Sequence, residues 1–304
     1  MRKARIFKTA SYVPEKILTN FSLEKMVETS DAWITERTGI KERRIVCERT
    51  KASDISFFAS VDIVEEGIDL LIVSTSTPDM IFPSTASILA ERLNLKNVAC
   101  FDISAACTGA LYALECGRFF IESGQYKKAL ITSAETTSKV IDWKDRNTCV
   151  LFGDGAGACL LKEGKDRGII GSYFNTNGSL ADILTLPLGE TIKMEGKEVF
   201  KYAVLYMTEA IEKLLFKTGF KMDEISLIIP HQANLRIITL LAKRLKIPEE
   251  KMFINLYKYG NMVSASTIVA LDEANKSKRI KEEDLVLLVG IGGGLTWGAM
   301  LVRW

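Results

Sequence analysis

One cysteine stands where a nucleophile could act. Cys107 follows a short apolar run at residues 98–103 and precedes a run without charge at residues 108–114. A run that is apolar on every side predicts a buried helix, so the order is strand, tight turn, Cys107, helix. The free N–H groups and the dipole at a helix N-terminus favour the thiolate, the reactive form of cysteine. Cysteine is also a common core residue, and this stretch alone leaves a nucleophile and a core residue both open.

Small residues on both sides, Ala106 and Thr108 among them, would let a substrate reach the sulfur of Cys107. The other five cysteines are interpreted as core residues. No two cysteines form a CxxC pair or a metal-ligand spacing, which predicts reduced thiols, no metal and a cytosolic protein. The five are Cys47, Cys100, Cys116, Cys149 and Cys159.

The chain has one histidine, His231. It follows an apolar run at residues 225–229 and Pro230, which places it at the carboxyl end of a predicted parallel strand. Open α/β sheets bind their ligands at that edge. An imidazole is also the side chain that titrates nearest neutrality. Although a lone histidine is more often a hydrogen-bonded structural residue, this position favours a catalytic role.

Asn261 lies in KYGNMVSAS, just before a run of small and apolar residues. Asparagine is a favoured helix N-cap. A cap and a catalytic amide can coexist only if the side chain points outward to the site. Gly260 in front of it would allow a close backbone approach.

Two glycine-rich stretches need separate interpretations. Residues 292–294 are three glycines that follow an apolar strand at 285–291 and precede strand-like residues. A phosphate-binding loop opens onto a helix, so this run predicts a turn whose N–H groups face a reacting oxygen. GDGAGA at residues 153–158 resembles a dinucleotide fingerprint, but the apolar run after it is too short for the required helix. We therefore exclude nucleotide redox chemistry.

The order of apolar runs predicts two α/β halves, residues 1–165 and 166–304. Strands that alternate with helices predict mainly parallel sheets layered with helices. AERLNL at 90–95 and AKRLKI at 242–247 precede corresponding elements, so we infer a duplication in which Cys107 and Asn261 occupy matching places. The expected strands are residues 4–9, 69–75, 98–103, 129–134, 225–229, 252–255 and 285–291, and the expected helices include 54–66, 84–93, 199–217, 235–245 and 262–271.

Composition excludes several classes of protein. The 304 residues are 47% apolar and 26% charged, which is typical of a globular protein. A net charge of +2, with acids and bases interspersed, argues against nucleic-acid binding, which needs a clustered basic face. No apolar run approaches the ~20 residues of a membrane span. Residues 1–3 lead into no signal-peptide core, so we expect a cytoplasmic protein without membrane contacts.

The family resemblance rests on five motifs: DISAACTGA, FGDGAGA, PHQANLR, KYGN and GGGLTWGAMLV. Together they resemble the β-ketoacyl-acyl carrier protein synthase III family, in the family's order and over nearly the whole chain. The resemblance implies the thiolase-like fold: an α/β protein of two duplicated halves, with mixed sheets layered between helices. It implies an acyltransferase that starts fatty acid synthesis by condensing an acyl-CoA primer with malonyl-acyl carrier protein, with loss of CO2. It further implies a homodimer without cofactor or metal. A related ketosynthase of secondary metabolism, or another thiolase-fold enzyme that condenses acyl-CoA, is the alternative.

The resemblance also assigns roles to single residues. Cys107, His231 and Asn261 form the catalytic triad, and the backbone N–H groups of Cys107 and Gly293 form the oxyanion hole. The family's other positions map onto residues of this chain as follows: Trp33, Arg37 and Arg146 contact CoA, Arg236 receives the carrier protein, Phe82 closes the acyl pocket across the dimer interface, and Asn234 supports the triad.

Two features depart from the family pattern. The helix expected to end at residue 66 is linked to the next strand by only Gly67-Ile68. Met262-Val263 follow Asn261 where the family usually has small hydroxyl residues. The first departure is remote from the expected site, whereas the second could alter the shape of the pocket and the choice of primer.

Overall fold

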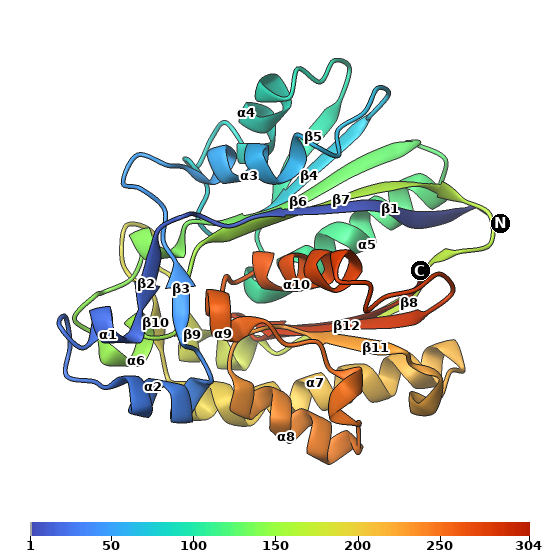
Figure 1. Ribbon diagram of the computed structural model, residues 1–304. Coiled ribbons are helices and arrows are strands. Elements are labelled where there is room, and N and C mark those ends of the chain that lie inside the picture. Colours follow the sequence, from blue (N-terminus) through green and yellow to red (C-terminus); the bar gives the residue numbers. More distant parts are fainter. Residues whose placement is uncertain (1) are drawn as a thin grey trace.

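Two β-sheets run through the centre of the molecule, each between layers of helices (Figure 1). The computed structural model describes residues 2–304. The first sheet has the order β1 (Lys3–Tyr12), β7 (Gly155–Gly164), β6 (Lys128–Glu135), β4 (Leu70–Ser74), β5 (Ala99–Ile103), and the second β11 (Leu227–Pro230), β12 (Leu285–Gly292), β13 (Thr296–Arg303), β8 (Gly168–Thr176). The mixed α/β architecture confirms the predicted fold class.

Three helix layers enclose these sheets (Figure 1). Helices α3 (Ala52–Ser60) and α4 (Thr85–Arg92) cover the outer face of the first sheet. Helices α7 (Gly196–Thr218) and α8 (Leu235–Leu245) cover the outer face of the second. Helices α5 (Gly109–Glu122) and α10 (Ala265–Lys276) lie between the sheets.

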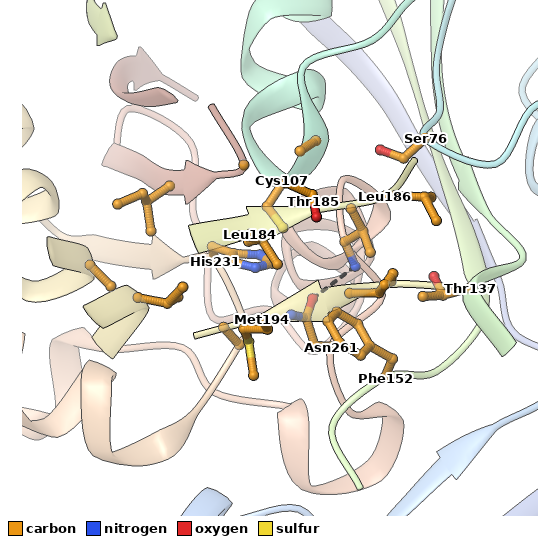
Figure 2. A pocket seen from close by; sticks show the side chains of 18 of the residues that line it. Ser76, Cys107, Thr137, Phe152, Leu184, Thr185, Leu186, Met194, His231 and Asn261 are labelled. Carbon is orange, nitrogen blue, oxygen red and sulfur yellow. Dashed lines mark hydrogen bonds between the residues drawn. The ribbon is translucent and has the colours of Figure 1, made fainter. Parts of the chain in front are cut away.

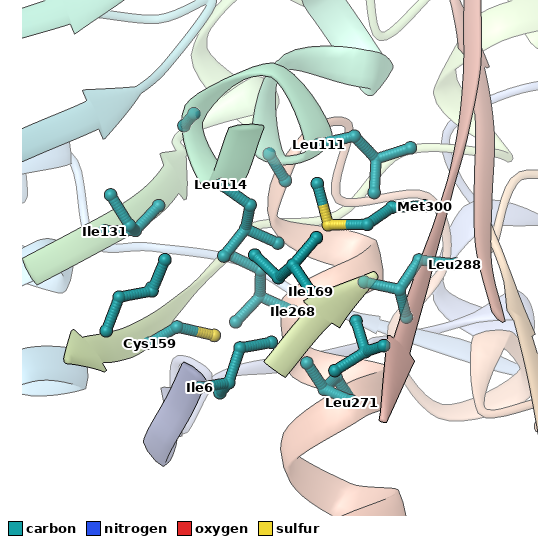
Figure 3. Close-up of a cluster of buried hydrophobic side chains, with 14 of the residues drawn as sticks. Ile6, Leu111, Leu114, Ile131, Cys159, Ile169, Ile268, Leu271, Leu288 and Met300 are labelled. Carbon is teal, nitrogen blue, oxygen red and sulfur yellow. The ribbon is translucent and has the colours of Figure 1, made fainter. Parts of the chain in front are cut away.

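The central layer is a continuous apolar core (Figure 3). Leu111 and Leu114 of α5 and Ile268 and Leu271 of α10 pack there against side chains from both sheets. Alternate residues of β4 face this core and the outer helix layer, so every residue of the strand is buried. Burial on both faces explains why such strands are continuous apolar runs in the sequence.

The two sheets share one order of strands. From β1 the first sheet continues with β7, the last strand of the first half, and from β8 the second sheet continues with β13, the last strand of the second half. Both orders end on a strand that is parallel to its neighbour, β5 beside β4 and β11 beside β12. In the second sheet the strand expected at residues 252–255 is reduced to a single bridge between Ile228 and Met252, so that expectation is wrong. All strands of the first sheet lie before residue 165 and all strands of the second after it. The matching order supports the division into halves at 165, which stays a prediction.

Two expectations about single elements are also corrected. Helix α3 ends at Ser60 and not near residue 66, because the chain leaves it in turns before β4. The link to β4 is therefore residues 61–69, and the first half is short in the helix instead, since α3 has 9 residues where α7 has 23. The residue before Cys107, Ala106, has a positive φ of 45°, and in the second half Val263 has φ 47°. By backbone conformation, then, Cys107 matches Ser264 and not Asn261.

Short elements gather at one end of the sheets (Figure 1). Their packing is local, as in the pairing of β2 with β3 and of β9 with β10. None of the helices within residues 2–304 combines the length and the apolar character needed to cross a bilayer. The short elements are β2 (Ile17–Thr19), α1 (Asn20–Leu23), α2 (Asp31–Thr38), β3 (Glu42–Arg44), α6 (Arg146–Cys149), β9 (Leu184–Thr185), β10 (Lys193–Met194) and α9 (Leu256–Tyr259).

Candidate active site

A cavity of about 120 Å³ lies where the two sheets meet, and side chains from both halves of the chain line it (Figure 2). Cys107, His231 and Asn261 all line this cavity, as does Gly293. Most of the remaining lining is apolar, including Leu184, an arrangement that suits an acyl chain with a few polar groups fixing its reactive end. The structure therefore brings together the three side chains that the sequence placed in separate motifs.

Cys107 lies in a 3₁₀ turn, Ala106–Thr108, that leads directly into α5. The end of β12 packs closely on this turn: a Cβ added to Gly292 would lie 2.6 Å from the Cys107 backbone nitrogen. Only glycine leaves room for that approach. Cys107 is 6% exposed and its side chain lines the cavity, so the residue belongs both to an apolar cluster and to the site.

The protonation state of Cys107 differs from the expectation. Burial strongly raises the pKa of its thiol, and the negative charge of Glu135 raises it further, whereas its own backbone N–H lowers it. The helix N-terminus predicted a stabilised thiolate. In the folded protein burial opposes that effect, and the raised pKa favours the thiol.

His231 follows the last residue of β11, and its backbone nitrogen donates to the Val289 carbonyl at 2.7 Å. The next residue, Gln232, fixes the turn by donating to the Phe253 carbonyl and accepting from the backbone of Asn255. Neither ring nitrogen of His231 has a hydrogen-bond partner within residues 2–304. Burial lowers the pKa of the imidazole to about 4, so it is neutral near pH 7, with one nitrogen able to donate and the other to accept.

Asn261 is held between the halves of the molecule. Gly260 has φ 65°, and a Cβ on it would lie 2.6 Å from the Leu151 carbonyl oxygen, which confirms the close approach expected there. The backbone nitrogen of Asn261 donates to that same carbonyl at 2.8 Å. Its side-chain Oδ1 accepts from the Val263 backbone nitrogen at 2.8 Å, which leaves Nδ2 to face the pocket as a donor (Figure 2).

The three groups can perform acyl transfer. A thiol can attack a thioester, while a neutral imidazole and an amide can donate to a carbonyl oxygen that gains negative charge. Gly293 follows β12 in the turn to β13, as predicted, and faces the same cavity. Residues 153–158 lead into β7 and not into a helix, which agrees with the exclusion of dinucleotide binding.

The positions mapped to CoA lie outside the cavity lining. The exposed guanidinium of Arg146 lies over the ring of the partly buried Trp33, 4.9 Å from its centroid, and donates to the Glu28 carbonyl. Arg37 is exposed on α2, and its carbonyl accepts from Asn234 Nδ2 at 3.2 Å. Gly39, at the end of α2, allows this contact because a Cβ there would lie 2.5 Å from Leu235 Cβ.

The other mapped residues have distinct surroundings. Asn234 caps α8 by accepting from the Arg236 backbone nitrogen, and its bonds go to this helix and to Arg37 rather than to the triad. Arg236 is exposed, with its guanidinium 5.3 Å from the Phe200 ring centroid. Phe82 is 82% exposed and does not line the cavity of its own chain. Among the other cysteines, Cys47 is exposed, so its interpretation as a core residue is wrong.

Sequence reasoning missed two parts of the site. The β9–β10 hairpin and one side of α7 supply much of the apolar wall, through residues such as Met194 and Met207. The hairpin strands are two residues long and show no periodicity that a sequence pattern could reveal. Glu135 was also missed, although an acid that ends an apolar parallel strand is a visible signal at the edge where ligands bind.

Fold and side chains together define a class. A thiol, an imidazole and an amide at the junction of two such α/β layers are the arrangement of a thiolase-like condensing enzyme, an acyltransferase. The chain belongs to the 3-oxoacyl-[acyl-carrier-protein] synthase III family: the family model matches residues 101–178, and the model of its C-terminal part matches residues 215–304.

Individual relatives agree over the full length. The chain is 48% identical to the beta-ketoacyl-[acyl-carrier-protein] synthase III of Caldanaerobacter subterraneus subsp. tengcongensis, covering 99% of this chain and 98% of the relative. The crystal structure of 3-oxoacyl-[acyl-carrier-protein] synthase III from Aquifex aeolicus superposes with a TM-score of 0.96 at 47% identity, over 99% of this chain and 100% of that one. The priming beta-ketosynthase of the R1128 polyketide pathway gives a TM-score of 0.93 at 30% identity, covering 99% and 96%.

Proposed function

We propose that this enzyme condenses an acyl-CoA primer with malonyl-acyl carrier protein, releasing CoA and CO2 and forming a 3-oxoacyl-acyl carrier protein. The observation that carries the proposal is the convergence of Cys107, His231 and Asn261 on one apolar cavity. The reaction is the first condensation of fatty acid synthesis, and we place it in the cytoplasm. The three side chains suffice for it, so no resident cofactor or metal is part of the proposal.

In the first half-reaction the sulfur of Cys107 attacks the thioester carbonyl of the acyl-CoA. A bond forms between that sulfur and the carbonyl carbon, the bond to the CoA sulfur breaks, and the thiol proton ends on the departing CoA. The neutral imidazole of His231 can carry the proton between the two sulfurs. The N–H groups of Cys107 and Gly293 stabilise the intermediate oxyanion, each such donor being typically worth about 3 kcal/mol.

In the second half-reaction malonyl-acyl carrier protein enters. His231 and Asn261 donate to its thioester carbonyl and stabilise the enolate that forms as CO2 leaves. The carbanion attacks the acyl carbon on Cys107, the bond from that carbon to the cysteine sulfur breaks, and the sulfur leaves as a thiolate that takes up a proton from water, which restores the thiol. Asn261 cannot accept a proton as a base would, which favours decarboxylation over proton abstraction from the second substrate.

The outer residues extend the proposal to the carriers. The adenine base of CoA can stack on Trp33, in the place that the Arg146 guanidinium occupies over that ring. Arg146 then moves to the other face of the adenine or to the phosphates of CoA. The exposed Arg37 and Arg236 lie on elements joined by Asn234, where they can receive acidic groups of CoA and of the carrier protein. We expect Arg146→Ala to raise the KM for acyl-CoA with little change in kcat.

The active unit that we propose is a homodimer. The adjacent apolar residues Ile81 and Phe82 are 78% and 82% exposed, and an exposed apolar stretch of this kind is unusual on the surface of a monomer. A second copy that covered this stretch would bury it and bring Phe82 to the acyl pocket. Sedimentation of the purified protein tests the state directly, and Phe82→Ser should weaken the dimer if the stretch is buried there.

The function is tested in two steps with one protein preparation. A panel of acyl-CoA primers is incubated with the enzyme, and peptide mass spectrometry shows which primers add an acyl group to Cys107. CO2 release and 3-oxoacyl product are then measured after malonyl-acyl carrier protein is added. An unmodified Cys107 with every primer contradicts the proposal.

A priming ketosynthase of secondary metabolism is the second candidate, favoured by the 30% identity to the R1128 enzyme. Both candidates share the acylation and decarboxylation steps, so those steps do not separate them. They differ in the carrier protein that delivers the malonyl group. Higher kcat/KM with the carrier protein of fatty acid synthesis than with polyketide carrier proteins supports the first candidate, and the reverse order supports the second.

A further inference from the structure

Glu135 is a buried carboxylate beside the cavity that the condensation, as described, does not use. It is the last residue of β6 and is 0% exposed. Within residues 2–304 it forms no ion pair, and burial raises its pKa to about 7. An unpaired carboxylate in such a place is destabilising unless hydrogen bonds offset its desolvation. Its partners therefore indicate what it does.

The partners of Glu135 come from both halves of the chain. Oε2 accepts from the Ser76 backbone nitrogen at 3.0 Å and from Thr77 Oγ1 at 3.1 Å. Oε1 accepts from Ser264 Oγ at 2.5 Å. Ser76 and Thr77 follow β4 and line the cavity, while Ser264 precedes α10. One carboxylate thus joins a loop of the first half to a helix N-terminus of the second.

This junction continues to the catalytic amide. Ser264 follows Val263, whose backbone nitrogen donates to Asn261 Oδ1 at 2.8 Å. Ser264 Oγ also lies 3.4 Å from the Ser74 carbonyl, at the end of β4. Hence the turn that orients Asn261 is tied to the first sheet through Ser264, and Glu135 is the acceptor that both sides share.

We propose that Glu135 is a positioning residue of this active site: its carboxylate holds the 76–77 loop and the Asn261 turn together. The proposal rests on the proposed function, because it concerns the step in which Asn261 acts.

The shared acceptor is tested with Glu135→Ala, which removes it from the Ser76 amide and the Ser264 hydroxyl. Acylation of Cys107 by acyl-CoA is measured by peptide mass spectrometry, and condensation is measured as CO2 release by enzyme acylated beforehand. We expect condensation to slow about tenfold or more, while the acylation rate stays within about twofold of the wild type. Glu135→Gln keeps an acceptor for the Ser76 nitrogen and can donate to the two hydroxyls, so it should restore most of the condensation rate.

The matched control is Asp272→Ala. Asp272 is also 0% exposed, lies on α10 and is bonded to Thr9, Ser11 and Lys276, away from the cavity lining. We expect this variant to acylate and condense as the wild type does. An unchanged condensation rate in Glu135→Ala, or an equal loss in Asp272→Ala, overturns the proposed positioning.

The link to Asn261 is tested with Ser264→Ala, which keeps the carboxylate and removes one bond. We expect acylation of Cys107 to stay within about twofold of the wild type, while condensation by pre-acylated enzyme slows about tenfold. Equal loss of acylation and condensation, or no loss of either, overturns the positioning. A wild-type enzyme that is acylated but does not condense disproves the proposed function, whereas a wild type that condenses beside unaffected variants overturns the positioning alone.

Discussion

The two helices of the central layer begin in the same way and end up with different tasks. A residue of positive φ precedes each start, Ala106 before Cys107 and Val263 before Ser264. In the first half the side chain that follows is a thiol turned into the cavity. In the second half it is a hydroxyl that donates to Glu135. The same backbone turn presents a thiol to the cavity in one half and holds the neighbouring amide, Asn261, in the other.

This comparison teaches that the turn alone does not make a reactive group. Both helix starts offer free N–H groups and a favourable dipole. Burial nevertheless raises the pKa of Cys107, and the Glu135 carboxylate raises it further. Reactivity therefore depends on what a bound substrate and His231 do to the thiol, and not on the helix end by itself.

The largest effect is expected at the first helix start. Cys107→Ala removes the nucleophile and should lower condensation by about 10⁴-fold or more. Cys149→Ala, a second buried cysteine that does not line the cavity, is the matched control and should keep its activity. Substantial product from the Cys107 variant would show that the first helix start does not supply the nucleophile, and that the two starts do not differ in this respect. Initial rates of 3-oxoacyl product formation measure both variants.

The next effect is expected just before the second helix start. Asn261→Ala removes one donor to the enolate, so condensation should fall by about 10²- to 10³-fold while Cys107 is still acylated. Asn275→Ala, on α10 with a bond to Thr9 Oγ1, is the control and should condense normally. Acylation is read by peptide mass and condensation by CO2 release. Loss of both activities together would place Asn261 in the first half-reaction as well.

Titration of Glu135, whose carboxylate lies between the two helix starts, should make the free energy of unfolding depend on pH. The pKa of Glu135 is raised to about 7 in the folded protein, so its protonated form contributes stability below the unfolded value and that contribution is lost as pH rises towards 7. Glutamine does not titrate, so the Glu135→Gln variant does not lose stability in this way as the pH rises. The free energy of unfolding of the variant relative to wild type should therefore rise by about 3 kcal/mol between pH 4.5 and 7.5. Urea unfolding at several pH values measures it, and a pH-independent difference contradicts the shift.

The smallest effect is expected from the hydroxyl of the second start. Ser264→Ala leaves part of a buried carboxylate without its donor and should lower the free energy of unfolding by about 1 to 3 kcal/mol at pH 7.5. The loss should shrink at pH 4.5, where Glu135 is protonated and needs less hydrogen bonding. Ser277→Ala, near the other end of α10, is exposed and serves as the control. Equal losses of unfolding free energy at both pH values would show that the contribution of Ser264 does not depend on the charge of Glu135.

Much of this protein could be predicted from local patterns. Continuous apolar runs such as β4 and β12 identified buried strands, because burial on both faces leaves no room for polar residues. Helix α8 was predicted with its observed bounds, since Asn234 caps its start and its apolar residues keep the helical period. The positions of Cys107, His231 and Asn261 at the ends of such elements were likewise visible in the sequence.

What the sequence by itself determined was the order of the elements and the chemistry-bearing residues at their ends, because both depend on local propensity and periodicity. Tertiary structure decided which side chains meet. It assigned Asn234 to a helix cap, matched Cys107 with Ser264, and reduced the strand expected at 252–255 to one bridge. It also decided the charge state of the site, because desolvation of Cys107 and its nearness to Glu135 exist only once both sheets have closed around them.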